Sequence, residues 1–227
     1  MRISHSKKFI FLANPRTAST SLRSVLDPHS DIKSRLVSDL TNDFPFYHHI
    51  TARELEGEFR KRGWEWENYQ KFCVVRNPFE RIVSLYNHQQ KIYKETSSLS
   101  QYFGAIGKYG FVHATKMCLL YLVRPKSFSE FVRRIDPKKS LTISIQNFTF
   151  DENEKSLVDY YLRFEYLEHD LPEVLAKFGI EITKDAIPKL NSASREKPLE
   201  EFYGEEEIAL MKEYYGYEIE KFGYEPK

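Results

Sequence analysis

One short stretch that follows an apolar run contains an arginine and several hydroxyl side chains. The apolar run is Phe9–Leu12, and the polar stretch is Asn14–Ser21, with the sequence Asn-Pro-Arg-Thr-Ala-Ser-Thr-Ser. A short apolar run is typical of a buried strand, and Leu22, Val25 and Leu26 have the spacing of one helix face. The N-terminus of a helix binds anions, because its free N–H groups and its dipole both face the ligand. The stretch therefore predicts a phosphate-binding turn between a strand and a helix.

This turn departs from the pattern of nucleoside triphosphatases. Their GxxxxGK[ST] loop needs a lysine for the terminal phosphates, and the cation of this stretch is Arg16. A guanidinium is planar, forked and never deprotonated in proteins. We therefore expect Arg16 to act through its charge, and we expect a phosphorylated ligand other than magnesium-bound ATP or GTP.

A second strand-to-helix junction carries a similar set of residues. The apolar run Phe72–Val75 predicts another buried strand, with Arg76 at its carboxyl end. Asn77 suits the N-cap of the next helix, and Glu80 occupies the position of a capping-box acid. Ligands of open α/β sheets bind beyond the carboxyl ends of the strands. Arg76, together with Ser84 two turns into the helix, is therefore expected to hold a second phosphate.

Two phosphate sites on one sheet suit an adenosine that is phosphorylated at both the 3′ and the 5′ position. The chain resembles the sulfotransferases that use 3′-phosphoadenosine 5′-phosphosulfate (PAPS), particularly carbohydrate sulfotransferases of the Golgi type and their bacterial relatives. Asn14–Ser21 is similar to the family's 5′-phosphosulfate loop, and Val75–Ser84 is similar to its 3′-phosphate motif. The resemblance continues, in the same order along the chain, through Gln146–Phe148, Arg163–Leu167, Leu190–Arg195 and Phe222–Tyr224.

The resemblance implies a set of residues that bind the donor PAPS. The family usually has lysine at the position of Arg16, so the implied role of Arg16 is to stabilise charge on the oxygen between sulfate and phosphate. Arg163 and Glu165 are expected to form an internal ion pair. The implied donor-binding residues are Pro15, Arg16, Thr17, Ala18, Ser19, Thr20, Ser21, Arg76, Ser84, Ser194 and Arg195.

Transfer to a hydroxyl also needs a base, and the resemblance implies a histidine between the two phosphate motifs. His48 and His49 both lie there, directly before a capping box formed by Thr51 and Glu54. The dipole of the helix that starts at this box should favour neutral imidazole, which is the form that accepts a proton. We expect His49 to be the base and keep His48 as the alternative. The acceptor is expected to be a hydroxyl compound, most simply a carbohydrate.

Length and motif order predict one sulfotransferase domain over residues 1–227. Its expected fold class is α/β, a P-loop-like three-layer domain with a central parallel sheet flanked by helices. The formal net charge is +1, which argues against a nucleic-acid partner, because such proteins carry an excess of basic residues. No Cys/His spacing indicates a zinc site, and we expect PAPS to be used without a metal.

The sequence leaves the oligomeric state open and predicts no membrane span. The apolar run at Phe9 is far too short to cross a bilayer. A cytoplasmic location is expected, and the alternative is that the chain is a trimmed catalytic domain of a longer protein. Two alternative functions remain. One is a P-loop kinase-like phosphotransferase, which would need a Walker lysine. The other is a non-catalytic nucleotide-binding module that has lost transfer.

Overall fold

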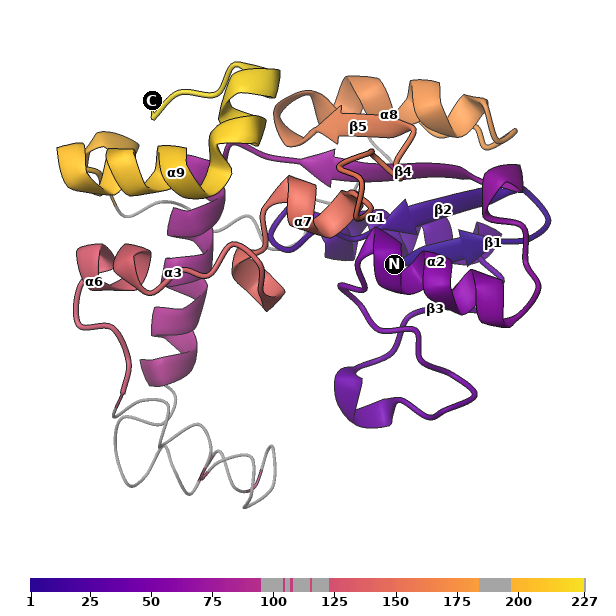
Figure 1. Cartoon of the computed structure of the whole chain (residues 1–227), viewed down its shortest axis with the longest axis horizontal. Helices are drawn as coiled ribbons and strands as arrows, with labels where there is room; N and C mark the ends of the chain where they lie inside the picture. Colours follow the sequence, from indigo (N-terminus) through magenta and orange to yellow (C-terminus); the bar gives the residue numbers. More distant parts are fainter. Residues whose placement is uncertain (95–103, 105–106, 108–114, 116–122, 184–196, 227) are drawn as a thin grey trace.

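A five-stranded sheet positions both strand-to-helix junctions (Figure 1). The structure is a computed structural model that describes residues 1–94, 104, 107, 115, 123–183 and 197–226. Across the sheet the strands follow the order β3 (Ile32–Lys33), β1 (Arg2–Ser4), β2 (Phe9–Leu12), β4 (Gln70–Val75) and β5 (Tyr160–Arg163). The two strands expected to carry phosphate-binding turns, β2 and β4, are therefore direct neighbours.

The sheet is mixed, which corrects the expectation of a central parallel sheet. Strands β2, β4 and β5 are parallel, but β1 pairs antiparallel with both β2 and β3. Only residues 5–8 separate β1 from β2, and a link of that length allows a hairpin but not the crossover that parallel strands need. Asp31 closes this hairpin by accepting a hydrogen bond from the N–H of His5 at 2.6 Å.

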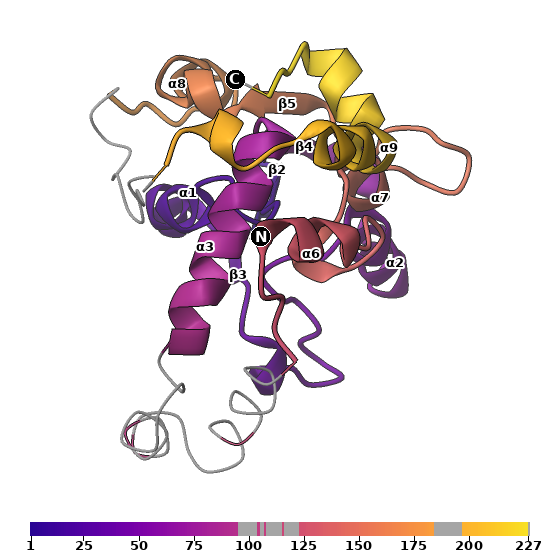
Figure 2. The ribbon, with the colours of Figure 1, turned by 90° about the vertical axis from the view of Figure 1, so that its left-hand side faces the viewer.

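Helices cover both faces of the sheet, so the fold has three layers (Figures 1 and 2). Phe9, Phe11, Phe72 and Val74 pack with α1 (Ser19–Leu26) and α8 (Leu167–Ala176). The alternate side chains of the same strands, Ile10, Leu12, Cys73 and Val75, pack with α2 (Ala52–Lys61) and α7 (Ile145–Thr149). Because both faces are buried, the parallel strands read as continuous apolar runs.

A third apolar cluster lies beside the sheet and contains three helices: α3 (Pro78–Lys94), α6 (Phe128–Arg133) and α9 (Glu205–Phe222). Figure 2 shows α6 and α9 against α3. Short 3₁₀ turns complete the described chain at Asp27–His29, Val37–Asp39, Trp66–Asn68, Ser140–Thr142, Phe164–Tyr166 and Leu199–Glu201. Since α3 begins directly after β4 and carries Ser84, this cluster sets the position of the second junction.

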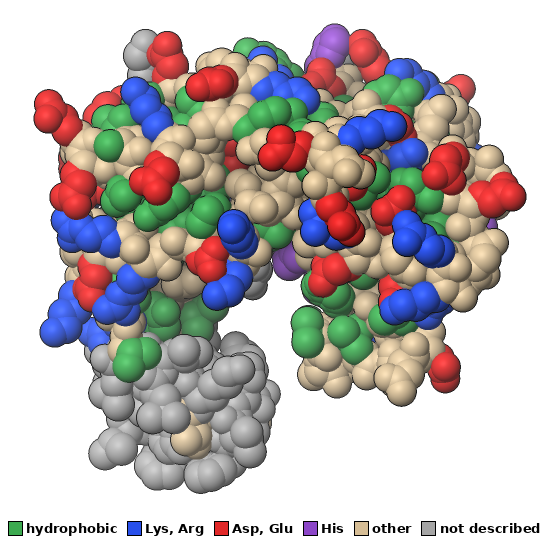
Figure 3. Space-filling view, in the orientation of Figure 1, with side chains coloured by type: hydrophobic (Ala, Val, Ile, Leu, Met, Phe, Trp, Pro, Cys, Tyr) green, Lys and Arg blue, Asp and Glu red, His purple; other side chains and the backbone are tan. Residues whose placement is uncertain are grey.

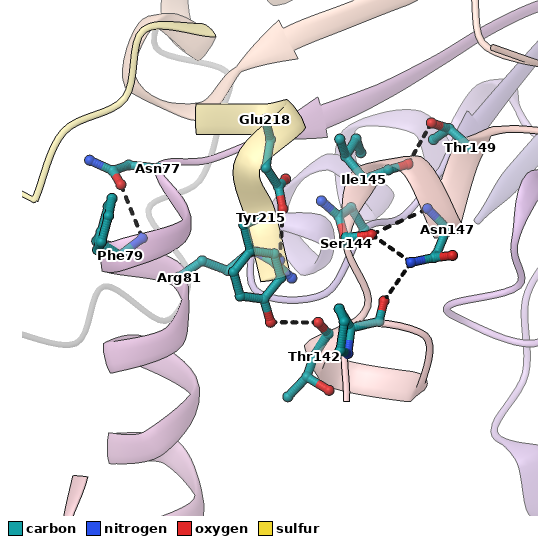
Figure 4. Close-up of polar contacts among 12 residues, drawn as sticks. Asn77, Phe79, Arg81, Thr142, Ser144, Ile145, Asn147, Thr149, Tyr215 and Glu218 are labelled. Carbon is teal, nitrogen blue, oxygen red and sulfur yellow. Dashed lines mark hydrogen bonds and ion pairs between the residues drawn. The ribbon is translucent and has the colours of Figure 1, made fainter. Parts of the chain in front are cut away.

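A buried ion pair joins α3 to α9 (Figure 4). Arg81 Nη2 lies 3.4 Å from Glu218 Oε1, and each side chain is only 1% exposed. Tyr215, whose backbone (φ −129°, ψ 21°) kinks α9, donates its hydroxyl to the carbonyl oxygen of Thr142 at 2.7 Å. Burial raises the pKa of Glu218 to about 7, although the charge of Arg81 opposes this. The pair therefore holds α3 against the C-terminal helix at a considerable desolvation cost.

Candidate functional site

The turn after β2 is built from residues in an unusual backbone conformation. Arg16 and Ala18 have φ angles of 63° and 57°, a region that non-glycine residues seldom adopt and that is often found at functional sites. α1 then starts at Ser19, and its N-cap residue Ala18 offers no side-chain acceptor to the first-turn N–H groups. In contrast, Thr51 and Glu54 cap α2 with the reciprocal bonds of a capping box. Among the residues that the structure describes, no side chain therefore caps the N-terminus of α1, and N–H groups at a helix N-terminus are typical donors to an anion.

The hydroxyl groups of this turn differ in what they do. Thr17 is fully buried and donates its hydroxyl to the carbonyl oxygen of Asn14 at 2.8 Å, so it shapes the turn from inside. Thr20 is exposed and accepts a hydrogen bond from Arg23. Ser19 and Ser21 are buried. The open N–H groups and Arg16 are therefore the parts of the turn best placed for charge recognition.

Asn14 ties the first turn to the neighbouring strand. Its side chain is 1% exposed and donates from Nδ2 to the carbonyl oxygen of Val74 at 3.2 Å. From the sequence, Asn14 is the first residue of the polar stretch Asn14–Ser21, and no contact with β4 was predicted for it. A signal was available, because an amide directly after a buried apolar run must find a hydrogen-bond partner. The contact keeps the carboxyl ends of β2 and β4 together.

Arg76 lies at the carboxyl end of β4, as expected, and its guanidinium is held on several sides. Nη1 donates to the carbonyl oxygen of Arg16 at 3.3 Å, and Nη2 is 3.1 Å from Glu80 Oε2. The guanidinium carbon lies 4.4 Å from the ring centre of Phe164. The sequence position of Glu80 predicted a capping-box acid. In the structure its carboxylate pairs with Arg76. Neither Glu80 nor Phe164 was predicted to contact this arginine.

The N-terminus of α3 is closed by residues from elsewhere in the chain. Asn77 caps it, because Oδ1 accepts from the N–H of Phe79 at 3.0 Å, and the N–H of Asn77 donates to Glu165 at 2.9 Å. Glu165 also accepts from the Tyr224 hydroxyl at 3.2 Å, while Arg163 donates to the carbonyl oxygen of Phe222. The expected Arg163–Glu165 ion pair is therefore wrong. The N–H groups of Asn77 and Phe79, at the start of α3, are therefore already paired.

The two turns meet through Arg16 and Ser84. The Arg16 guanidinium donates to the Ser84 hydroxyl from Nε at 3.3 Å and from Nη2 at 3.0 Å. Burial, followed by repulsion from Arg76, lowers the pKa of Arg16 from its usual value. The structure thus brings the cation of the first turn, the cation of the second turn and the helix serine into one group. Pro15 lies in the first turn, whereas Ser194 and Arg195 lie outside the described residues.

His49 is anchored at the start of the first turn. Its Nδ1 lies 2.7 Å from the carbonyl oxygen of Ala13, the residue directly before Asn14. A carbonyl oxygen only accepts, so Nδ1 carries the proton and neutral His49 presents an unprotonated Nε2. Burial lowers the pKa of His49 to about 4, although the bond to Ala13 opposes this. Burial, not the predicted helix dipole, is thus the main reason that this imidazole stays neutral.

His48 has a different environment. Its Nδ1 lies 2.7 Å from the hydroxyl of Ser34, and its ring centre is 6.4 Å from that of His49. Burial and then the charge of Arg23 lower the pKa of His48 to about 4. Both histidines are therefore neutral near pH 7, and pKa alone does not separate them. What separates them is that His49 bonds the backbone of Ala13, directly before the first turn, whereas His48 bonds the side chain of Ser34.

The face seen in Figure 3 is hollowed beside the segment formed by residues 34–46, and a histidine side chain is visible at the top of the hollow. Lysine, arginine and acidic side chains are interspersed over this face.

Within the described ranges, no group of three or more His, Cys, Asp or Glu side chains is arranged to hold a metal ion.

Fold and site together define an α/β protein in which two cationic strand-to-helix junctions meet at the carboxyl ends of neighbouring parallel strands. The chain belongs to the sulfotransferase family, whose model matches residues 1–225. No curated protein and no solved structure matched the chain. Of the helices that the structure describes, none is both long and apolar enough to span a membrane.

Proposed function

We propose that this protein transfers the sulfuryl group of PAPS to a hydroxyl group, with a carbohydrate as the acceptor class. The observation that carries the proposal is the contact of Arg16 with Ser84, which joins two anion-binding junctions on adjacent strands. A bisphosphorylated nucleotide offers one phosphate to each junction, on a P-loop-like scaffold. Family membership independently supports sulfuryl transfer.

The donor fits the residues that are present. The open N-terminus of α1 and the charge of Arg16 suit the 5′-phosphosulfate. Arg76 and Ser84 suit the 3′-phosphate, and Arg76 Nε is buried with no hydrogen-bond partner in the described part of the chain. An unpaired buried donor is costly, and a phosphate oxygen would satisfy it.

The proposed reaction is a single in-line transfer. His49 Nε2 takes the proton of the acceptor hydroxyl as its oxygen forms a bond to sulfur. The bond between sulfur and the 5′-phosphate oxygen breaks, and its electron pair stays on that phosphate oxygen. Arg16 stabilises the growing negative charge, and Ala13 holds His49 in the tautomer that accepts the proton.

Thermal unfolding tests the donor assignment, because a ligand that binds only the native state raises the melting temperature. Adenosine 3′,5′-bisphosphate should raise it at concentrations at which adenosine 5′-monophosphate has a much smaller effect. Stabilisation by ATP with magnesium, and none by the bisphosphate, would favour the kinase-like alternative. Stabilisation by the bisphosphate without transfer to any acceptor in a screen with labelled PAPS would favour the binding module.

A further inference from the structure

Glu80 pairs with Arg76, the arginine that is proposed to bind the 3′-phosphate. Its carboxylate oxygen Oε2 lies 3.1 Å from Arg76 Nη2, and the two side chains are only 20% and 18% exposed. The contact is an ion pair between residues four positions apart, at the start of α3. Arginine binds carboxylates and phosphates through the same planar set of N–H donors. A carboxylate here is therefore a chemical substitute for the anion that the site is proposed to bind.

The rest of the Arg76 guanidinium is fixed in place without Glu80. Nη1 donates to the carbonyl oxygen of Arg16, and the guanidinium lies over the ring of Phe164. Nε is buried and has no hydrogen-bond partner among the described residues. Two contacts thus orient the cation, while the carboxylate supplies charge compensation. A largely buried arginine without a counter-ion would be costly, and Glu80 removes that cost when no nucleotide is bound.

We propose that Glu80 is an exchangeable counter-ion that Arg76 releases when the 3′-phosphate binds, and that it thereby limits the affinity of the site for bisphosphorylated nucleotide. This inference rests on the proposed function. A phosphate dianion beside an ionised carboxylate is repelled, and in a partly buried site little screening weakens the repulsion. The same repulsion acts on the donor and on the bisphosphate product, so Glu80 also speeds product release. It is a residue that sets affinity, and it has no part in bond making.

The test is Glu80→Gln, which keeps the shape of the side chain and removes its charge. The variant should bind adenosine 3′,5′-bisphosphate about tenfold more tightly than the wild type, which corresponds to about 1.4 kcal/mol of repulsion removed. Its affinity for adenosine 5′-monophosphate, which lacks the 3′-phosphate, should stay unchanged. Titration calorimetry gives both affinities, and stopped-flow displacement should show a correspondingly slower release of the bisphosphate.

Two matched variants make the result specific. Glu67→Gln removes the same charge from an exposed position in the 3₁₀ turn before β4, and it should leave both affinities unchanged. Glu80→Asp keeps the charge, and it should retain an affinity ratio close to that of the wild type. This second variant also gives a reading if Glu80→Gln does not fold.

Three outcomes would overturn the inference. Weaker bisphosphate binding by Glu80→Gln would mean that Glu80 orients Arg76. An equal change for both nucleotides, or tighter bisphosphate binding by Glu67→Gln, would mean a general charge effect. In contrast, a wild-type protein that does not prefer the bisphosphate to the monophosphate would contradict the proposed function itself, so the two failures are distinguishable.

Discussion

The guanidinium of Arg16 donates two hydrogen bonds to the hydroxyl of Ser84, at 3.3 and 3.0 Å, across 68 positions of sequence. Arg16 belongs to the turn after β2, and Ser84 lies two turns into α3. The contact therefore connects the proposed 5′-phosphosulfate site with the proposed 3′-phosphate site. If the 3′-phosphate of the proposed donor binds Ser84, it has to displace or share these hydrogen bonds.

Removal of either proposed 3′-phosphate ligand should affect one nucleotide selectively. Arg76→Ala should weaken the binding of adenosine 3′,5′-bisphosphate by about 1.5–3 kcal/mol, because it removes a charge-assisted contact. Ser84→Ala should cost less, about 0.5–1.5 kcal/mol, because a neutral hydroxyl is lost. Calorimetric titration with the bisphosphate and with adenosine 5′-monophosphate checks this. Equal losses for the two nucleotides would disprove the assignment.

Substitution of the two neighbouring histidines separates catalysis from binding. His49→Ala should bind adenosine 3′,5′-bisphosphate nearly as well as the wild type, yet it should lose transfer by about 10²–10⁴-fold, the usual contribution of a general base. His48→Ala is the matched control and should lose much less, because its imidazole bonds Ser34 instead of the turn. If His49→Ala instead transfers at the wild-type rate and His48→Ala is inactive, then His48 is the base and His49 is not.

The pH dependence of transfer follows from the lowered pKa of His49. The base works only when neutral, and burial places its pKa at about 4. The wild-type kcat/KM should therefore stay level as the pH falls from 8 to about 5, and should decrease only as the pH approaches 4. Circular dichroism must show that the protein remains folded over this range. A decrease centred on the ordinary histidine value of about 6.5 would contradict the buried environment described for His49.

Mutation of the buried ion pair between α3 and α9 should strongly lower the free energy of unfolding. Arg81→Ala or Glu218→Ala should lower the free energy of unfolding by about 3–5 kcal/mol, because each leaves the opposite charge buried and unpaired. A double variant, Arg81→Met with Glu218→Leu, should recover most of the loss. Urea unfolding of the three variants measures these differences, and a double variant less stable than both single ones would contradict the prediction.

Glu218 should make the free energy of unfolding depend on pH in a defined direction. Its pKa is raised in the folded state to about 7 from a usual value of 4.5, so the folded state binds the proton more tightly. Its contribution to the free energy of unfolding therefore decreases as the pH rises through this interval. Glu218→Gln lacks this dependence. Relative to wild type, it should gain stability between pH 4.5 and 7, and a constant difference would contradict the raised pKa.

Transfer should not require a divalent metal. The first turn lacks the lysine and the overall pattern of magnesium-dependent nucleotide loops, and a sulfuryl group carries less charge than a phosphoryl group. Activity in excess EDTA should equal activity with magnesium at the same ionic strength. Complete loss in EDTA that added metal restores would favour the kinase-like alternative.

The sequence by itself determined the features that depend on neighbouring residues. The apolar runs predicted β2 and β4, the hydroxyl-rich stretch predicted the start of α1, and Thr51 with Glu54 predicted a capping box whose bonds are both present. These predictions succeed because strand burial and helix capping depend on side chains only a few residues apart. Local residue patterns are therefore sufficient to locate both junctions.

Only the tertiary structure decided which distant groups meet. The hydrogen bonds of Arg16 to Ser84, the contact of Arg76 with Phe164 and the buried contact of Arg81 with Glu218 were not predicted. Burial, the main cause of the low pKa of His49, was likewise visible only in the fold. Pairing and desolvation depend on the packing of elements that lie far apart in the chain, and no local pattern of residue types specifies that packing.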